Sequence, residues 1–195
     1  MVFRIIFIGD KGCGKSSLIR RYCENDFETS YSPSLGIEKY EQIKICSTIK
    51  DNYEYKIPIG LQLWDTSSIW HPDIIKQYFA GMHCVVIIFD TSSNRAAADI
   101  KKWYQLLENF IIQTNITKPL IYVVGNKIDA GNRCSEEIIY PYIEVSAKTG
   151  FGVNNLFSDI SYALIREYPE LAYKNSKRKA FSSLDVCKYC FCNIL

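Results

Sequence analysis

The chain has 195 residues and a mass of 22.5 kDa, which is the size of about one domain. Hydrophobic residues make up 48% of it and charged residues 23%, so whole-chain disorder and a collagen-like repeat are excluded. The net charge of +2 gives no overall basic field, and we therefore expect no nucleic-acid partner.

Short β-rich runs alternate along the chain with longer helical stretches. In chain order, the pattern predicts a strand over Phe3–Ile8, a helix over Lys15–Cys23, strands over Glu41–Ile49, Ile57–Trp64 and Cys84–Asp90, a helix over Asp99–Gln113, strands over Leu120–Gly125 and Tyr142–Val145, and a helix over Val153–Tyr168. Apolar strands separated by helices are typical of a parallel sheet covered on both faces. We therefore expect an α/β fold with a mostly parallel six-stranded sheet, helices on both faces and one antiparallel edge strand from residues 41–64.

The C-terminal end differs in composition from the rest of the chain. Pro169 is expected to end the last helix, and residues 169–195 hold five Lys or Arg and two Asp or Glu. We expect a domain at residues 1–168 and a disordered basic tail at 169–195, which favours an anionic surface such as a membrane. The eight cysteines follow no secretory signal, so we expect reduced thiols in a cytosolic protein.

A glycine-rich segment lies between the first predicted strand and the first predicted helix. Residues 9–16 have the sequence GDKGCGKS, which fits the phosphate-binding pattern G-x-x-x-x-G-K-S. Glycines let backbone N–H groups turn toward phosphate oxygens, and the helix N-terminus adds its positive dipole. Lys15 is expected to reach the β- and γ-phosphates and the Ser16 hydroxyl to bind Mg²⁺. The predicted loop residues are Gly12, Cys13, Gly14, Lys15, Ser16 and Ser17.

Two further motifs indicate guanine rather than adenine. Residues 126–129 have the sequence NKID at the end of a predicted strand, and residues 146–148 have the sequence SAK. Asp129 can accept two hydrogen bonds from guanine, whereas adenine has no donors there and would leave the acceptor unpaired. Lys127 can lie along the base, and the Ala147 N–H can meet guanine O6. The predicted base-binding residues are Asn126, Lys127, Asp129, Ser146, Ala147 and Lys148.

In these motifs the chain resembles the Ras superfamily of small GTPases, and within it the Rab branch. The resemblance covers residues 2–168 and includes WDT at 64–66 and EVSAKTG at 144–150. It implies a P-loop NTPase G domain that binds GTP or GDP with Mg²⁺. It also implies that Phe27 packs on the guanine edge, that Ser34 binds Mg²⁺ and the γ-phosphate, and that Asp65 holds Mg²⁺ through water. The implied metal site is Ser16, Ser34 and Asp65.

Switch II departs from the family pattern. The family sequence is WDTAGQE, whereas residues 64–70 are WDTSSIW, so Ile69 takes the place of the Gln that orients the attacking water. Isoleucine can neither accept nor donate a hydrogen bond. No catalytic residue is assigned, with His71 left as a replacement base and Lys11 as a group that reaches either the γ-phosphate or solvent. We expect weak GTP hydrolysis, the alternative being a nucleotide-locked binding module (a pseudo-GTPase).

The last nine residues have the sequence CKYCFCNIL. Cys192 fits the C-a-a-X pattern with a terminal Leu, which favours geranylgeranylation, and Cys190 with Cys192 is similar to the Rab Cys-x-Cys pair. Metal binding through three thiols is the rival hypothesis. The resemblance then implies a Rab-type switch in vesicle trafficking, which meets exchange factors, GTPase-activating proteins and effectors through its switch regions. It also implies cycling between the cytosol and the cytoplasmic face of an endomembrane or the plasma membrane.

Overall fold

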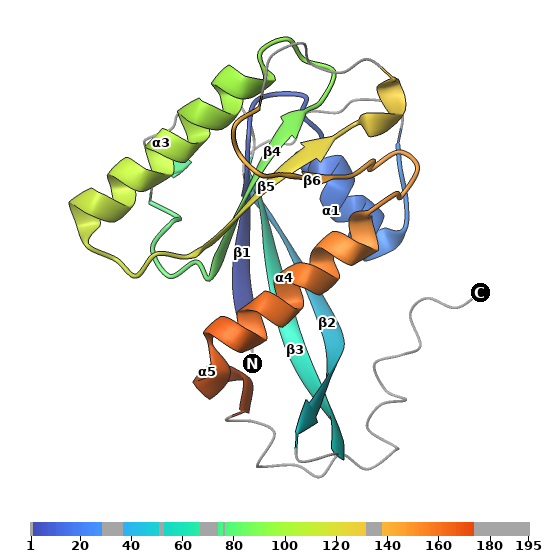
Figure 1. Cartoon of the computed structure of the whole chain (residues 1–195), viewed down its shortest axis with the longest axis vertical. Coiled ribbons are helices and arrows are strands. Elements are labelled where there is room, and N and C mark those ends of the chain that lie inside the picture. The colour runs from blue at the N-terminus through green and yellow to red at the C-terminus, as the bar shows by residue number, and fades with distance from the viewer. Residues whose placement is uncertain are drawn as a thin grey trace.

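The computed structural model describes residues 2–28, 37–50, 53–66, 74–75, 77–131 and 138–173. These residues form three layers, with a twisted sheet between helices (Figure 1). Helix α3 covers one face of the sheet, and helices α1 and α4 cover the other. The predicted fold class, an α/β domain with helices on both faces, is confirmed.

The described residues contain one six-stranded sheet, in the order β2-β3-β1-β4-β5-β6. Strand β1 is parallel to β3 and β4, β4 to β5, and β5 to β6, while the edge strand β2 is antiparallel to β3. The prediction of a mostly parallel sheet with one antiparallel edge strand is therefore confirmed. The strands are β1 (Val2–Ile8), β2 (Ile37–Lys50), β3 (Tyr53–Thr66), β4 (Cys84–Asp90), β5 (Leu120–Asn126) and β6 (Ile143–Glu144).

Strands β2 and β3 are longer than predicted. Their register runs from Ile37 opposite Thr66 to Lys50 opposite Tyr53. The local signal is weak at the strand ends because charged residues such as Glu54 and Lys56 have low β-propensity. Pairing along the full length of the partner strand outweighs that preference.

The described helices are α1 (Lys15–Glu24), α3 (Ala96–Thr114), α4 (Val153–Glu167) and α5 (Pro169–Tyr173), with a 3₁₀ turn at Ile128–Ala130. Helix α3 begins before its predicted start because three alanines, the strongest helix formers, precede Asp99. Pro169 ends α4 as predicted but also begins α5, since proline is tolerated in the first turn of a helix. The segment predicted as tail is therefore helical as far as Tyr173, and residues 174–195 lie outside the described residues. No described helix is both long and apolar enough to cross a membrane.

Phe157 joins the two helices on one face of the sheet. It is fully buried in α4 and stacks on Tyr22 of α1, with ring centroids 3.6 Å apart. Its ring also lies 6.0 Å from that of Phe7 in β1. Stacked and tilted aromatic pairs add to the stabilisation that comes from buried apolar area. Phe157 therefore holds α1 against the sheet, and the predicted phosphate loop directly precedes this helix.

We predict that Phe157→Ala lowers the free energy of unfolding by about 3–5 kcal/mol, because it leaves a cavity among three elements. Urea unfolding followed by circular dichroism measures this change. Phe151→Ala is the matched control, since Phe151 is 62% exposed just before α4, and it should change stability by less than about 0.5 kcal/mol. Equal losses in the two variants would contradict the assignment.

Candidate nucleotide-binding site

The predicted phosphate-binding loop connects β1 to α1. Gly14 precedes the helix with a φ of 93°, and a Cβ there would lie 2.2 Å from Asn126 Nδ2. Only glycine accommodates both the backbone conformation and the close approach. Helix α1 begins at Lys15, so the free N–H groups of its first turn lie at the loop. This arrangement is a ready anion site.

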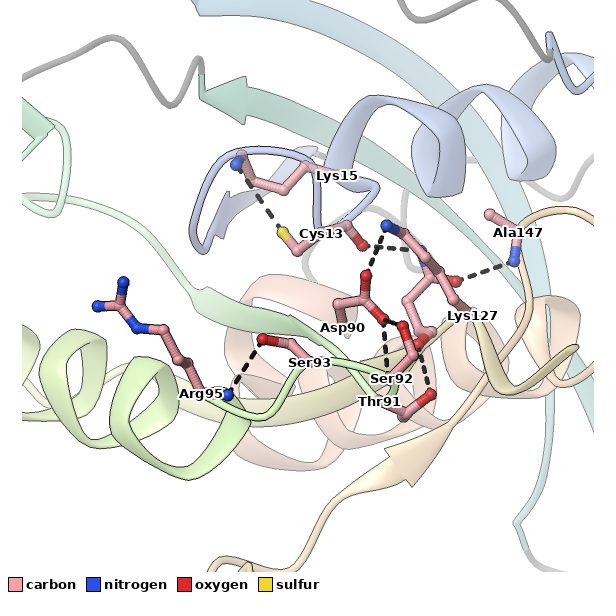
Figure 2. Close-up of polar contacts among 10 residues, drawn as sticks. Cys13, Lys15, Asp90, Thr91, Ser92, Ser93, Arg95, Lys127 and Ala147 are labelled. Carbon is pink, nitrogen blue, oxygen red and sulfur yellow. Dashed lines mark hydrogen bonds and ion pairs between the residues drawn. The ribbon is translucent and has the colours of Figure 1, made fainter. Parts of the chain in front are cut away.

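Lys15 lies across the loop and is only 6% exposed. Its Nζ donates to the carbonyls of Gly9 at 2.8 Å and Asp10 at 3.1 Å, and lies 3.9 Å from Cys13 Sγ (Figure 2). A buried ammonium needs such acceptors. The structure therefore places this cation inside the loop predicted to hold phosphates, while its contact with the β- and γ-phosphates stays a prediction.

Asn126, at the end of β5, joins the predicted motifs. Its Nδ2 donates to Cys13 O at 2.9 Å, and its Oδ1 accepts from the Ala147 N–H at 3.0 Å. Its carbonyl accepts from both the N–H and the hydroxyl of Thr91, at 3.0 and 2.9 Å. The side chain is fully buried. One amide thus brings the predicted phosphate loop, the NKID motif and the SAK motif to a single point.

The two motifs predicted to bind the base also contact each other directly. The Ser146 hydroxyl donates to Asp129 Oδ1 at 2.6 Å and accepts from the Thr149 N–H at 3.0 Å. Lys148 Nζ lies 3.9 Å from Asp129 Oδ2. These contacts orient the carboxylate that is predicted to accept from guanine.

Asp90 lies in the candidate site, and the sequence analysis did not assign it there. It ends β4 opposite Asn126, and its Oδ2 pairs with Lys127 Nζ at 2.6 Å. Its Oδ1 accepts from the N–H and hydroxyl of Ser92 at 2.9 and 2.6 Å (Figure 2). Burial opposes ionisation, but these hydrogen bonds and Lys127 keep the pKa of Asp90 below its ordinary value. The sequence signal for this role was a carboxylate at the end of β4, the strand next to the one that ends in NKID.

Two of the three predicted Mg²⁺ residues are described. Ser16 lies in the first turn of α1, and Asp65 is fully buried near the end of β3, opposite Phe7 of β1. Hydroxyl and carboxylate oxygens are the ligands that Mg²⁺ takes, together with phosphate oxygens and water, so this donor set fits the ion. Within the described ranges, no group of three or more His, Cys, Asp or Glu could hold a metal by itself.

Some of the remaining predicted residues are described by the structure and the others are not. Gly12 lies on the loop and Ser17 on α1, and half-buried Phe27 packs against the hydrophobic core. Lys11 is exposed. Outside the described residues lie Ser34, Ile69, His71, Cys190 and Cys192.

The loop is also held from α3, which the sequence analysis did not foresee. Asp10 Oδ1 accepts from Lys102 Nζ at 2.7 Å and from Trp103 Nε1 at 2.9 Å. Burial would raise the pKa of Asp10, but these partners keep it below its ordinary value. Burial and the neighbouring Asp10 carboxyl raise the pKa of Asp99 to about 6, against the opposing charges of Arg95 and Lys102. The available signal was the spacing of residues 99, 102 and 103, which places them on one helical face.

We predict that Asp99→Asn removes part of the pH dependence of stability. Because its folded-state pKa is raised, Asp99 stabilises the fold below about pH 4, and this stabilisation is lost as pH rises through about 6. Urea unfolding at about pH 5 and at about pH 7 measures the free energy of unfolding, which should fall less between these two pH values in the variant than in the wild type. Asp159→Asn, at an exposed position on α4, is the control and should follow the wild type. If Asp99→Asn loses as much free energy of unfolding between these two pH values as the wild type does, the assignment is wrong.

Comparison with known proteins agrees with this geometry. A sequence model of the Ras family matches residues 4–166. Ras-related protein Rab-1 of Theileria annulata is 32% identical over 187 residues, which cover 88% of this chain and 79% of that protein. RabC of Dictyostelium discoideum is 29% identical over 188 residues, covering 91% and 88%, and Rab7 of Prunus armeniaca is 28% identical over 187 residues, covering 87% and 85%. The chain therefore belongs to the Ras family and is a Rab-like small GTPase of the Ras superfamily.

Proposed function

We propose that this chain is a guanine-nucleotide-binding switch of the Rab type, which recruits effectors to membranes in vesicle trafficking and hydrolyses GTP slowly without help. The observation that carries the proposal is the buried Asn126 amide, whose two hydrogen bonds hold Cys13 and Ala147 together. This contact supports a site in which the phosphate loop and the guanine-reading loop bind one molecule.

The residues divide the nucleotide between them. Backbone N–H groups of residues 12–17 and the α1 N-terminus bind the phosphates, with the Lys15 ammonium neutralising their charge. The Asp129 carboxylate recognises guanine, and the Lys127 stem lies along the base. The Ala147 N–H, which donates to Asn126 Oδ1 in the structure, would share its hydrogen with guanine O6. Ser16, Ser34 and Asp65 hold Mg²⁺, which supplies positive charge to the phosphate oxygens when bound.

Slow hydrolysis follows from the sequence of switch II. Ile69 stands where the family Gln orients water, and residues 64–70 contain no glutamine or asparagine. The second candidate function, a nucleotide-locked binding module, rests on the same substitution. Partner binding would then depend on nucleotide occupancy and not on turnover.

The membrane part of the proposal rests on the C-terminal sequence. Cys192 and Cys190 are the proposed lipidation sites, with basic residues upstream that attract anionic lipid. One prenyl chain anchors weakly, so the basic residues supply the second signal. Exchange factors, GTPase-activating proteins and effectors are proposed to bind the switch regions.

We predict that Asn126→Ala weakens GDP binding at least tenfold, because it leaves Cys13 O and the Ala147 N–H without their partner. Titration of a fluorescent GDP analogue measures the dissociation constant. Asn154→Ala, at an exposed position on α4, is the matched control and should bind as the wild type does. Unchanged binding by Asn126→Ala would overturn the carrying observation.

We predict that bound GTP outlasts the lifetime of roughly half an hour that is typical of this class. Protein loaded with GTP and Mg²⁺ is followed by chromatography of the bound nucleotide over a day. Ile69→Gln should shorten the GTP lifetime, whereas Ile112→Gln, at a position 77% exposed on α3, should not.

Three outcomes separate the candidates. Slow GDP formation supports the weak enzyme, and no GDP within a day supports the nucleotide-locked module. GDP formation at the ordinary class rate contradicts the proposed role of Ile69.

A further inference from the structure

Arg21 on α1 makes an unusual set of contacts for a helical side chain. Its Nε donates to Ala147 O at 2.8 Å and its Nη2 to Lys148 O at 2.9 Å. Its Nη1 donates to Asn25 O at 2.8 Å. Each guanidinium nitrogen therefore has its own backbone carbonyl, which uses the planar fork of donors that arginine alone provides.

These three carbonyls belong to two separate segments of the proposed guanine site. Ala147 and Lys148 lie in the SAK loop, whereas Asn25 follows α1 and precedes Phe27 by two residues. The Arg21 guanidinium carbon also lies 6.0 Å from the centroid of the Phe27 ring. One side chain thus joins the loop proposed to read guanine O6 to the segment that carries the proposed aromatic edge contact.

The contact of Arg21 with Asn25 lies at the C-terminal end of α1. Asn25 ends α1 in the left-handed conformation, with a φ of 53°, so the chain turns sharply away from the helix there. Its carbonyl lies at the C-terminal end of the helix dipole, where a cation is favourable. Charge-assisted hydrogen bonds are roughly twice as strong as neutral ones, so the guanidinium stabilises this turn and the SAK loop together.

We propose that Arg21 is a positioning residue for guanine recognition, which holds the 146–148 loop against α1 so that the Ala147 N–H meets the six-position oxygen of the base. The proposal rests on the proposed function, because it assigns a role within that guanine site. Arg21 acts through the loop and through the Phe27 segment. Loss of the fork releases the loop, weakens the contact at the six position and speeds nucleotide release.

The test compares three nucleoside diphosphates that differ in one base contact each. GDP carries both the six-position oxygen and the two-position amine, inosine diphosphate lacks the amine, and 6-thioguanosine diphosphate keeps the N1–H and the amine but carries sulfur, a weaker acceptor, in place of the oxygen. Their affinities for full-length wild type, Arg21→Ala, Arg21→Lys and Arg166→Ala are measured by competition with fluorescent GDP. Dissociation rates are measured by chase with excess GDP. Arg166→Ala, at an exposed position on α4, is the matched control.

We expect both Arg21 variants to release GDP about tenfold faster, the effect of losing one or two charge-assisted hydrogen bonds. The preference for GDP over the 6-thioguanosine nucleotide should fall, because it reports the contact at the six position. The preference for GDP over inosine diphosphate should fall less, because it reports the Asp129 contact, which Arg21 reaches only indirectly through the hydrogen bond from Ser146 to Asp129. Arg166→Ala should match the wild type throughout.

Several results overturn the proposal. If Arg21→Ala weakens the affinity for all three nucleotides equally, Arg21 only supports the fold. If Arg21→Lys has the affinities and the GDP dissociation rate of the wild type, the positive charge alone suffices. Arg21→Lys keeps the stem and charge, so it carries the test if Arg21→Ala does not fold. If the wild type binds none of the nucleotides, both the proposed function and this inference are wrong. If the wild type binds GDP but the Arg21 variants keep its nucleotide preferences, only this inference is wrong.

Discussion

The side-chain amide of Asn126 is the interaction on which the site depends. It donates to Cys13 O and accepts from the Ala147 N–H, and it is completely buried. An aspartate could accept from Ala147 but could not donate to the carbonyl, and a glutamine would be one carbon too long for the same space. The space is also set by Gly14, where a Cβ would come within 2.2 Å of the amide nitrogen. The glycine and the asparagine are therefore one structural requirement, although 112 positions of sequence separate them.

Three further contacts hold the segments that meet at Asn126. Helix α3 holds the phosphate loop through Asp10, strand β4 holds the NKID segment through Asp90, and helix α1 holds the SAK loop through Arg21. In each case a rigid helix or strand supplies the side chain and a loop receives it. This is the arrangement that keeps a site ordered when its binding groups are mostly backbone atoms. The carboxyl ends of the parallel strands bring these loops to one edge of the sheet, as is usual for ligand sites in such folds.

The sequence predicted the strands and helices near the site because each carries a strong local pattern. Residues 84–90 are almost continuously apolar, and the structure has a strand with those bounds. The site motifs were predictable for the same reason, since residues 9–16 and 126–129 are contiguous. Asp10, Asp90 and Arg21 were not assigned their roles, because their long-range partners lie between 37 and 127 positions away and the contacts exist only after packing. The start of α3 and the length of β2 were missed because alanine propensity and strand pairing outweigh the local hydrophobic pattern.

Binding and turnover depend on different kinds of groups in this fold. The proposed phosphate contacts are mostly backbone N–H groups, which any residue of suitable conformation supplies, and the described contacts that hold them lie in the loops after β1, β5 and β6. In the proposed function, orientation of the attacking water instead requires one polar side chain, and residue 69 is isoleucine. A substitution there removes a group that acts in the transition state while leaving the ground-state contacts of the nucleotide untouched. In the proposed function, a substitution at position 69 therefore lengthens the lifetime of the GTP-bound state without weakening nucleotide binding.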